Sequence, residues 1–262
     1  MTDETPEPIP PEDLAQLAPG IALALAPQPE TDDGPRRRRR GEQDTYDALR
    51  KWQPKTRLGR MVIEGDILNY EKALDTGLPI REVEIIDALL PGLDDHVINV
   101  NMIQRMTDSG RRVRFNVMAC VGNGDGYVGL AICKGKDVAS TIRKSIDIAK
   151  LDIIQVMRGN GSWESGPGGG TSIPFKVTGR CGSTRVTLIP APAGKGLVIG
   201  ETGAAVLRLA GITDIYSKTR GQTRTTINFA RATFNALKQL NAARVSDEQK
   251  KRMFMNTGRN LG

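Results

Sequence analysis

The stretch Ser172-Ile-Pro-Phe-Lys-Val-Thr-Gly-Arg-Cys-Gly-Ser183 decides the fold, together with Leu188-Ile-Pro-Ala-Pro-Ala-Gly-Lys-Gly-Leu197. β-forming side chains alternate here with cations, and glycines permit tight turns between them. We therefore predict two strands, near Phe175–Cys181 and Thr184–Ile189. Neither strand carries a pattern of catalytic residues.

The residues that follow continue with helices and strands in alternation. Their periodicity predicts a helix near Glu201–Ala210, a short strand at Asp214–Ser217 and a helix near Thr225–Leu240. The expected order is therefore β-β-α-β-α. Tyr216 lies in the short strand, beside Lys218 and Arg220. Its ring has two candidate roles, stacking and core packing, of which we favour core packing.

A second set of elements precedes the deciding stretch. Pro79 is expected to open a helix that carries Val83, Ile86 and Leu90 at helical spacing. Three strands are expected next, near Val97–Met106, Arg111–Val121 and Tyr127–Cys133. Asp137 then suits the N-cap of a long helix. The apolar stripe predicted for that helix is Val138, Ile142, Ile146, Ala149 and Ile153.

The second of these strands alternates between apolar and polar side chains. One set is Val113, Phe115, Val117, Ala119 and Val121, and the other is Arg112, Arg114 and Asn116. Successive side chains of a strand point to opposite faces. We therefore expect one face to pack on a core and the opposite face to present cations.

Charge is distributed unevenly along the chain. Residues 1–35 contain eight acidic residues and no Lys or Arg, whereas residues 36–262 carry a net charge of +15 within a total of +7. Arg36 to Arg40 form an unbroken basic run, which favours an extended arm along a phosphate backbone. A basic body of this kind predicts a polyanionic partner, most simply a nucleic acid.

Several catalytic and cofactor readings are excluded or weakened by the residues present. Gly124-x-Gly126-x-x-Gly129 matches a dinucleotide-binding fingerprint, but a strand follows it rather than the helix that a pyrophosphate needs. With His96 as the only histidine and Cys120, Cys133 and Cys181 as the only cysteines, we expect no metal site and no catalytic triad. Aromatic residues are few, with five Phe, four Tyr and two Trp. Their shortage argues for recognition of RNA by backbone and shape rather than by stacking.

Motifs along about three quarters of the chain resemble the small-subunit ribosomal protein five family, in its archaeal and eukaryotic branch. Beside the deciding stretch, they include Trp52-Gln-Pro-Lys-Thr-Arg-Leu-Gly-Arg60, Thr76-Gly-Leu-Pro-Ile-Arg81, Val121-Gly-Asn-Gly-Asp-Gly-Tyr-Val-Gly129 and Ser217-Lys-Thr-Arg-Gly-Gln-Thr-Arg224. The resemblance implies an α+β protein. Its first domain would be an α-β-β-β-α fold similar to double-stranded-RNA-binding domains, and its second a β-β-α-β-α domain with a left-handed βαβ crossover.

The expected organisation has six parts. They are an acidic extension that ends in the arginine run (1–40), an N-terminal arm (41–75), the double-stranded-RNA-binding-like domain (76–158), a Gly-rich connection (159–171), the C-terminal ribosomal domain (172–241) and a tail (242–262). The acidic leader and the run Pro167-Gly-Gly-Gly170 depart from the family's shared pattern.

The resemblance implies a structural, non-enzymatic component of small ribosomal subunits in the cytoplasm, without a cofactor. It implies binding to 16S-type ribosomal RNA where head, body and neck meet, beside ribosomal proteins four, eight and two and near the path of messenger RNA. Roles in assembly, decoding accuracy and messenger unwinding follow from the same analogy. The candidate RNA-binding residues are Arg57, Arg60, Arg111, Arg112, Arg114, Lys134, Lys136, Arg143, Lys144, Lys195, Lys218, Arg220 and Arg224.

Two other functions are compatible with parts of the sequence. The first domain alone permits a free-standing RNA chaperone or double-stranded-RNA-binding protein. The superfold of the second domain also occurs in enzymes such as small-molecule kinases, although fold does not confer function.

Overall fold

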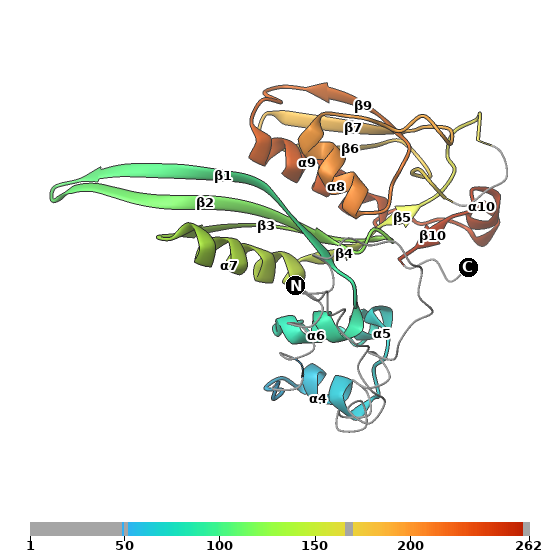
Figure 1. Cartoon of the computed structure of the whole chain (residues 1–262). Coiled ribbons are helices and arrows are strands. Elements are labelled where there is room, and N and C mark those ends of the chain that lie inside the picture. The colour runs from blue at the N-terminus through green and yellow to red at the C-terminus, as the bar shows by residue number, and fades with distance from the viewer. Residues whose placement is uncertain (1–48, 50–51, 166–169, 259–262) are drawn as a thin grey trace, which may run out of the picture. The chain divides into compact units, whose positions relative to one another are not determined.

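The computed structural model describes residue 49, residues 52–165 and residues 170–258 (Figure 1). Its contacts divide the chain into two compact units, one up to Gly92 and the other from Leu93 onward. The arginine run 36–40 lies outside the described residues. The predicted domain 76–158 crosses the boundary between the two units, and its limits stay a prediction.

Within its described residues, the first unit has the short helices α4 (Arg57–Glu64), α5 (Tyr70–Asp75) and α6 (Val83–Leu89). The Oε1 atom of Glu82 accepts hydrogen bonds from the amides of Lys55 and Thr56, at 3.0 and 2.6 Å, and Oε2 accepts one from the Trp52 indole at 2.8 Å. Glu82 keeps an extended backbone (φ −105°, ψ 130°) as the N-cap residue of α6. The helix therefore begins at Val83, four residues later than the Pro79 start that the sequence predicts.

The second unit begins with an antiparallel sheet in the order β1-β2-β3-β4. Its strands are β1 (Asp94–Thr107), β2 (Gly110–Gly122), β3 (Tyr127–Gly135) and β4 (Ile153–Gln155). Helix α7 (Val138–Leu151) packs on β2 and β3, and the Asp137 side chain caps it by accepting from the Ser140 amide at 3.1 Å. The predicted strands and N-cap are confirmed.

The buried stripe of α7 differs from the predicted one. Thr141, Ser145 and Ala149 are buried at its centre, whereas Ile142 and Ile146 are only half-buried beside it. A Cβ atom on Gly129 would collide with the Ala149 carbonyl, and one on Gly135 with the Thr141 hydroxyl. The glycines bring the helix so close to β3 that only small side chains fit between them.

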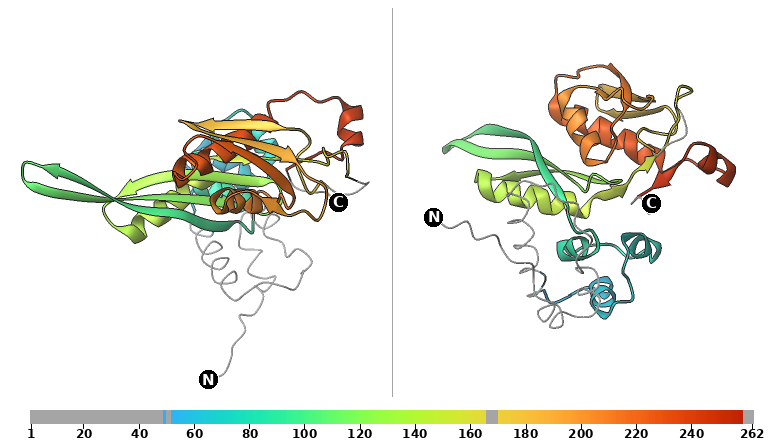
Figure 2. Two further views of the ribbon diagram at one scale, coloured as in Figure 1. Left: turned by 90° about the horizontal axis from the view of Figure 1, so that it is seen from above. Right: turned by 45° about the vertical axis from the view of Figure 1, so that its right-hand side comes forward.

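The burial of β2 side chains changes along the length of the strand and does not simply alternate between its two faces. Residues 116–122 are buried without a break, whereas residues 110–114 are exposed. Near its end, β2 packs between α7 on one side and the C-terminal half of the unit on the other. At its beginning, the β1–β2 hairpin extends beyond β3 and α7 (Figures 1 and 2). The prediction of one buried and one cationic face is therefore wrong for the buried end.

The C-terminal half builds a second sheet in the order β6-β7-β9-β8. Its elements are β6 (Val177–Cys181), β7 (Thr184–Pro190), β8 (Leu197–Val198), α8 (Glu201–Leu209), β9 (Ile215–Arg220) and α9 (Thr226–Leu240). Strand β8, which the sequence did not predict, pairs parallel with β9, and α8 connects the two. Helix α9 packs on β6 and β7.

The two four-stranded sheets of the second unit share one hydrophobic core. Met118, Cys120 and Leu130 of the first sheet cluster with Leu207, Phe229 and Leu237 of the C-terminal helices, together with further apolar residues. Burial raises the pKa of the Cys120 thiol to about 12. The turn after β2 also rests on α8, since the Gly124 amide donates to the Leu209 carbonyl at 3.0 Å. The Gly-rich connection therefore joins halves that pack as one body.

The end of the chain returns to this body. After α10 (Asp247–Arg252), strand β10 (Asn256–Thr257) pairs with β5 (Met157–Arg158). The buried Arg158 guanidinium contacts Asp125 at 2.5 Å and donates to the Gly258 carbonyl at 3.1 Å. One side chain thus connects the β2–β3 turn, the segment after β4 and the C-terminal segment.

Candidate nucleic-acid interface

A cationic pocket lies at the exposed end of the first sheet. Arg112, Val113, Arg114 and Lys136 line it, and its volume is about 520 Å³. Strand alternation puts Arg112 and Arg114 on one face of β2, and Lys136 comes directly before the N-cap of α7. Three positive side chains around one hollow suit a phosphate group or another oxyanion. Three of the predicted residues are therefore brought together.

Arg105 belongs to the same surface, although it is not among the residues that the sequence predicts to bind RNA. The hairpin register pairs Arg105 with Arg112 and Ile103 with Arg114. Directly paired residues share a face, so Arg105, Arg112 and Arg114 line one side of the hairpin. Like charges directly opposite each other repel, and a bound polyanion would offset this repulsion. The turn at residues 108–110 sets this register, because pairing outward from Thr107 and Gly110 brings Arg105 opposite Arg112.

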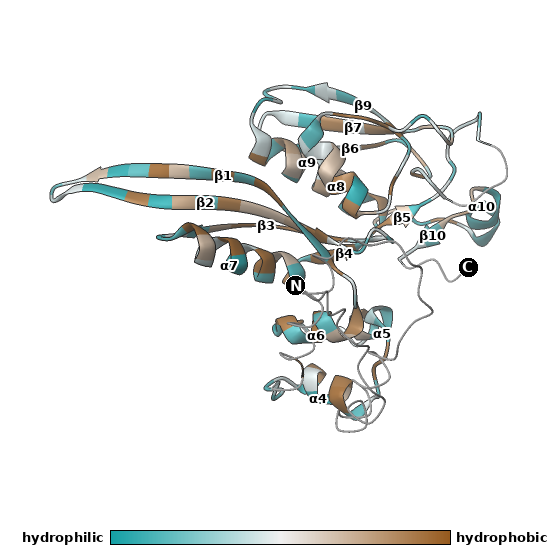
Figure 3. Cartoon of the chain, in the orientation of Figure 1, coloured by the Kyte–Doolittle hydropathy of each residue, from teal (hydrophilic) through white to brown (hydrophobic). Residues whose placement is uncertain are grey.

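Arg111 lies on the opposite face of the hairpin. It pairs with Met106 and directly precedes Arg112 in β2, so strand alternation points the two side chains to opposite faces. Met102 and Met106 share its face and are 64 and 66% exposed. Arg111 therefore lies on the face opposite to Arg112 and Arg114, and its role in RNA binding stays a prediction. Figure 3 shows how hydrophilic and hydrophobic residues are interspersed along the protruding strands.

The other predicted cations of the second unit are distributed over its surface. Lys134 pairs with Asn116 at the end of β3, while Arg143 and Lys144 lie exposed on α7. Lys218 and Arg220 are exposed on β9, Lys195 lies in the loop before β8, and Arg224 precedes α9. The first unit carries Arg57 and Arg60, which are exposed on α4.

Asp214 holds the loop that presents Lys195. Its carboxylate is buried, accepts from the Gly196 amide at 2.8 Å and accepts from the Thr213 hydroxyl at 3.0 Å. Burial raises the pKa of this carboxyl, but hydrogen bonds from Gly196, Thr213 and neighbouring groups outweigh burial, so the pKa lies below its usual range. The buried carboxylate of Asp214 therefore restrains the loop that presents the exposed Lys195 side chain. No local sequence pattern indicates this role.

We expect the variant Asp214→Ala to loosen this loop. Hydrogen bonds to a charged acceptor are stronger than neutral ones, so the Gly196 amide should exchange its hydrogen about ten- to a hundredfold faster. Since folding lowers the pKa of Asp214, its stabilising effect is full above the ordinary aspartate value of about 3.9 and fades as the pH falls below it. Hydrogen exchange followed by NMR measures both effects. Asp214→Asn, which keeps an acceptor oxygen, is the control, and equal exchange in the alanine variant would contradict the role.

The described part of the chain meets neither the requirements of a metal-binding side-chain cluster nor those of a membrane-spanning helix. No cluster of three or more His, Cys, Asp or Glu side chains there could hold a metal ion. No helix within the same residues is long and apolar enough to cross a bilayer. The structure places Arg and Lys side chains on exposed strands and loops, and this arrangement is suited to binding phosphate groups.

Comparisons with known proteins identify relatives for most of the chain. A family model for the N-terminal domain of ribosomal protein S5 matches residues 93–157, and a model for the C-terminal domain of ribosomal protein S5 matches residues 179–252. The small ribosomal subunit protein uS5 of Methanothermobacter thermautotrophicus is 54% identical over 205 residues, covering 78% of this chain and 95% of the relative. The protein of the same name from Halobacterium salinarum is 56% identical over 194 residues, covering 74 and 92%.

Proposed function

Because this chain belongs to the ribosomal protein S5 family, in its archaeal and eukaryotic branch, we propose that it is a structural constituent of the small ribosomal subunit that binds ribosomal RNA. The observation that carries the RNA contact is the cationic pocket of Arg112, Arg114 and Lys136, extended by Arg105. The proposed function involves no reaction catalysed by this chain.

The finer parts of the proposal come from the family resemblance. They are contact with 16S-type RNA at the junction of head, body and neck, neighbouring ribosomal proteins four, eight and two, a nearby messenger path, and effects on decoding accuracy and messenger unwinding. The same proposal includes the double-stranded-RNA-binding-like domain, a left-handed crossover from β8 through α8 to β9, and a cytoplasmic location. The shared core of the two sheets supports a rigid body that holds its RNA contacts at fixed separation.

A free-standing RNA-binding protein is the second candidate, which the cationic hairpin alone would also suit. A sucrose gradient of cell extract after a high-salt wash separates the two functions, because salt removes proteins held by phosphate contacts alone. Stoichiometric retention of the chain in the small-subunit peak is the expected result. Release to the top of the gradient would contradict a structural role in the subunit.

We expect the triple variant Arg112→Gln, Arg114→Gln, Lys136→Gln to weaken binding to small-subunit RNA about a hundredfold. Each lost phosphate contact also lowers the slope of log affinity against log salt by roughly 0.7–0.9, so the slope should decrease by about two to three. Filter binding at several salt concentrations measures both quantities.

The matched control removes the same charge from α10, with Lys250, Lys251 and Arg252 changed to Gln. These residues follow one another at the exposed end of that helix. An equal loss of affinity in both triple variants would show that net charge, rather than the cationic pocket, governs binding.

A further inference from the structure

One face of the C-terminal sheet is left uncovered by the helices. Helices α8 and α9 lie on the same side of strands β6, β7 and β9 (Figures 1 and 2). Toward α9 point Gly179, Val186 and Leu188, all buried. The alternate residues of the same strands therefore form an outer face, which we call the open sheet face: Thr178, Arg180, Arg185, Thr187, Ile189, Tyr216, Lys218 and Arg220.

Cations gather at one end of the open sheet face. Arg185 of the middle strand pairs with Arg180 on one side and with Arg220 on the other. The three arginines are thus cross-strand neighbours in one row over three strands, and all are exposed. The next row of cross-strand neighbours is Thr178, Thr187 and Lys218. Strands β6, β7 and β9 contain no acidic residue, so this end attracts anions.

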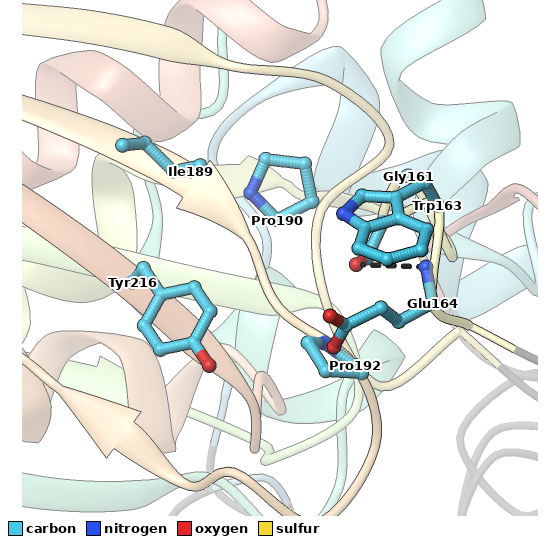
Figure 4. Close-up of a pocket in the computed structure, with 8 residues that line it drawn as sticks. Gly161, Trp163, Glu164, Ile189, Pro190, Pro192 and Tyr216 are labelled. Atoms are coloured by element: carbon cyan, nitrogen blue, oxygen red, sulfur yellow. Dashed lines mark hydrogen bonds between the residues drawn. The ribbon is translucent and has the colours of Figure 1, made fainter.

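Aromatic side chains occupy the opposite end. Tyr216 pairs with Ile189 there, and beside them lies a pocket of about 370 Å³ that Trp163, Glu164, Pro190 and Pro192 also line. Trp163 is 91% exposed. In Figure 4, the tyrosine and tryptophan rings stand on opposite sides of the pocket. Tyr216 is half-buried, so its predicted role in core packing describes only part of its surroundings.

We propose that the open sheet face binds single-stranded RNA, with an unpaired base in the pocket between Tyr216 and Trp163. The phosphates of neighbouring nucleotides would lie along Lys218 and the three arginines. Strand geometry puts Tyr216 and Arg220 about 13 Å apart, so a single nucleotide cannot contact both ends. This surface is separate from the cationic pocket and goes beyond the proposed contact with ribosomal RNA.

The charges decide which part of the RNA goes to which end. Glu164 lines the aromatic pocket and disfavours a phosphate there, while its carboxylate can accept a hydrogen bond from the exocyclic amine of a base such as cytosine. A base in a duplex is stacked and paired, so it does not reach a pocket of this kind without being flipped out. A proline-rich peptide would suit the aromatic end but would leave the three arginines without partners.

The test uses the fluorescence of Trp163 in the full chain. Titration with a ten-nucleotide oligocytidylate is expected to quench the emission as a base stacks on the indole. An abasic ribose-phosphate oligomer of the same length should bind at least fivefold more weakly and leave the emission unchanged. Trp163→Phe keeps a stacking ring and removes the reporter, which isolates the signal of Trp163 from that of Trp52. Trp163→Ala should lose at least fivefold in affinity.

Two further variants separate this surface from the cationic pocket. Changing Arg180, Arg185 and Arg220 to Gln should weaken oligocytidylate binding at least tenfold and flatten its salt dependence. The triple variant at Arg112, Arg114 and Lys136 should keep the quenching unchanged while it loses affinity for folded RNA. The proposal is overturned if the abasic oligomer or an RNA duplex binds as well as oligocytidylate, or if no oligomer quenches the emission.

Discussion

The variant Gly179→Val is expected to lose about 3 kcal/mol or more of its free energy of unfolding. A Cβ atom at this position would collide with the Ala232 carbonyl and the Ala236 amide of α9, and would lie 2.8 Å from the Ala236 Cβ. The colliding atoms belong to a helix backbone, so no side-chain rotation relieves the contact. Helix α9 must move away from β6, which opens the core that joins the two sheets.

Urea unfolding followed by circular dichroism measures this loss. Thr178→Val is the matched control, because it adds the same side chain one residue earlier on the open sheet face. Thr178 is exposed, and its hydroxyl lies 2.9 Å from that of Thr187. We expect the control to change stability by less than about 1 kcal/mol. Similar unfolding midpoints for the two variants would contradict the close approach of α9.

The second large effect is expected at the contact between Arg158 and Asp125. The Arg158 side chain is 5% exposed and the Asp125 side chain 33% exposed. Asp125→Ala leaves a buried guanidinium without its counter-ion, and we expect a loss of about 3–5 kcal/mol. Arg158→Met leaves a carboxylate that water can still reach, so a smaller loss is expected. Urea unfolding of both variants tests this asymmetry.

The double variant completes the cycle. If the two charges stabilise the fold through each other, Asp125→Ala combined with Arg158→Met should be at least about 1 kcal/mol more stable than the sum of the single losses predicts. Methionine also fills part of the space of the arginine chain. Strictly additive losses would show that the two side chains act independently, and would remove the role of their contact in connecting the β2–β3 turn to β5.

Local elements were predictable because their signals lie within a few residues of one another. Asp137 caps α7 as expected, and the helices near Glu201–Ala210 and Thr225–Leu240 form within a residue of their predicted limits. Helix α6 starts later because Glu82, a residue with ordinary helix propensity, bonds instead to the amides of Lys55 and Thr56. That contact spans more than twenty residues, and periodicity carries no trace of it.

The candidate site was only partly predictable for the same reason. Arg112 and Arg114 could be placed on one face from alternation within a single strand. Arg105 required the hairpin register, which pairs it with Arg112 from a different strand. The open sheet face depends on three strands and a loop, so Trp163 and Tyr216 gave no sign in the sequence that they flank one pocket.

The sequence by itself determined the α+β character, the family and the net positive charge, because composition, periodicity and motifs are properties of short stretches. Only the tertiary structure decided which glycines are indispensable, that Arg105 lies opposite Arg112, and that both four-stranded sheets of the second unit close over one core. These features depend on backbones that approach one another from distant parts of the chain. Gly179 beneath α9 and Arg158, which contacts the β2–β3 turn and the C-terminal segment, are the clearest cases, since the role of each is set by atoms more than thirty residues away.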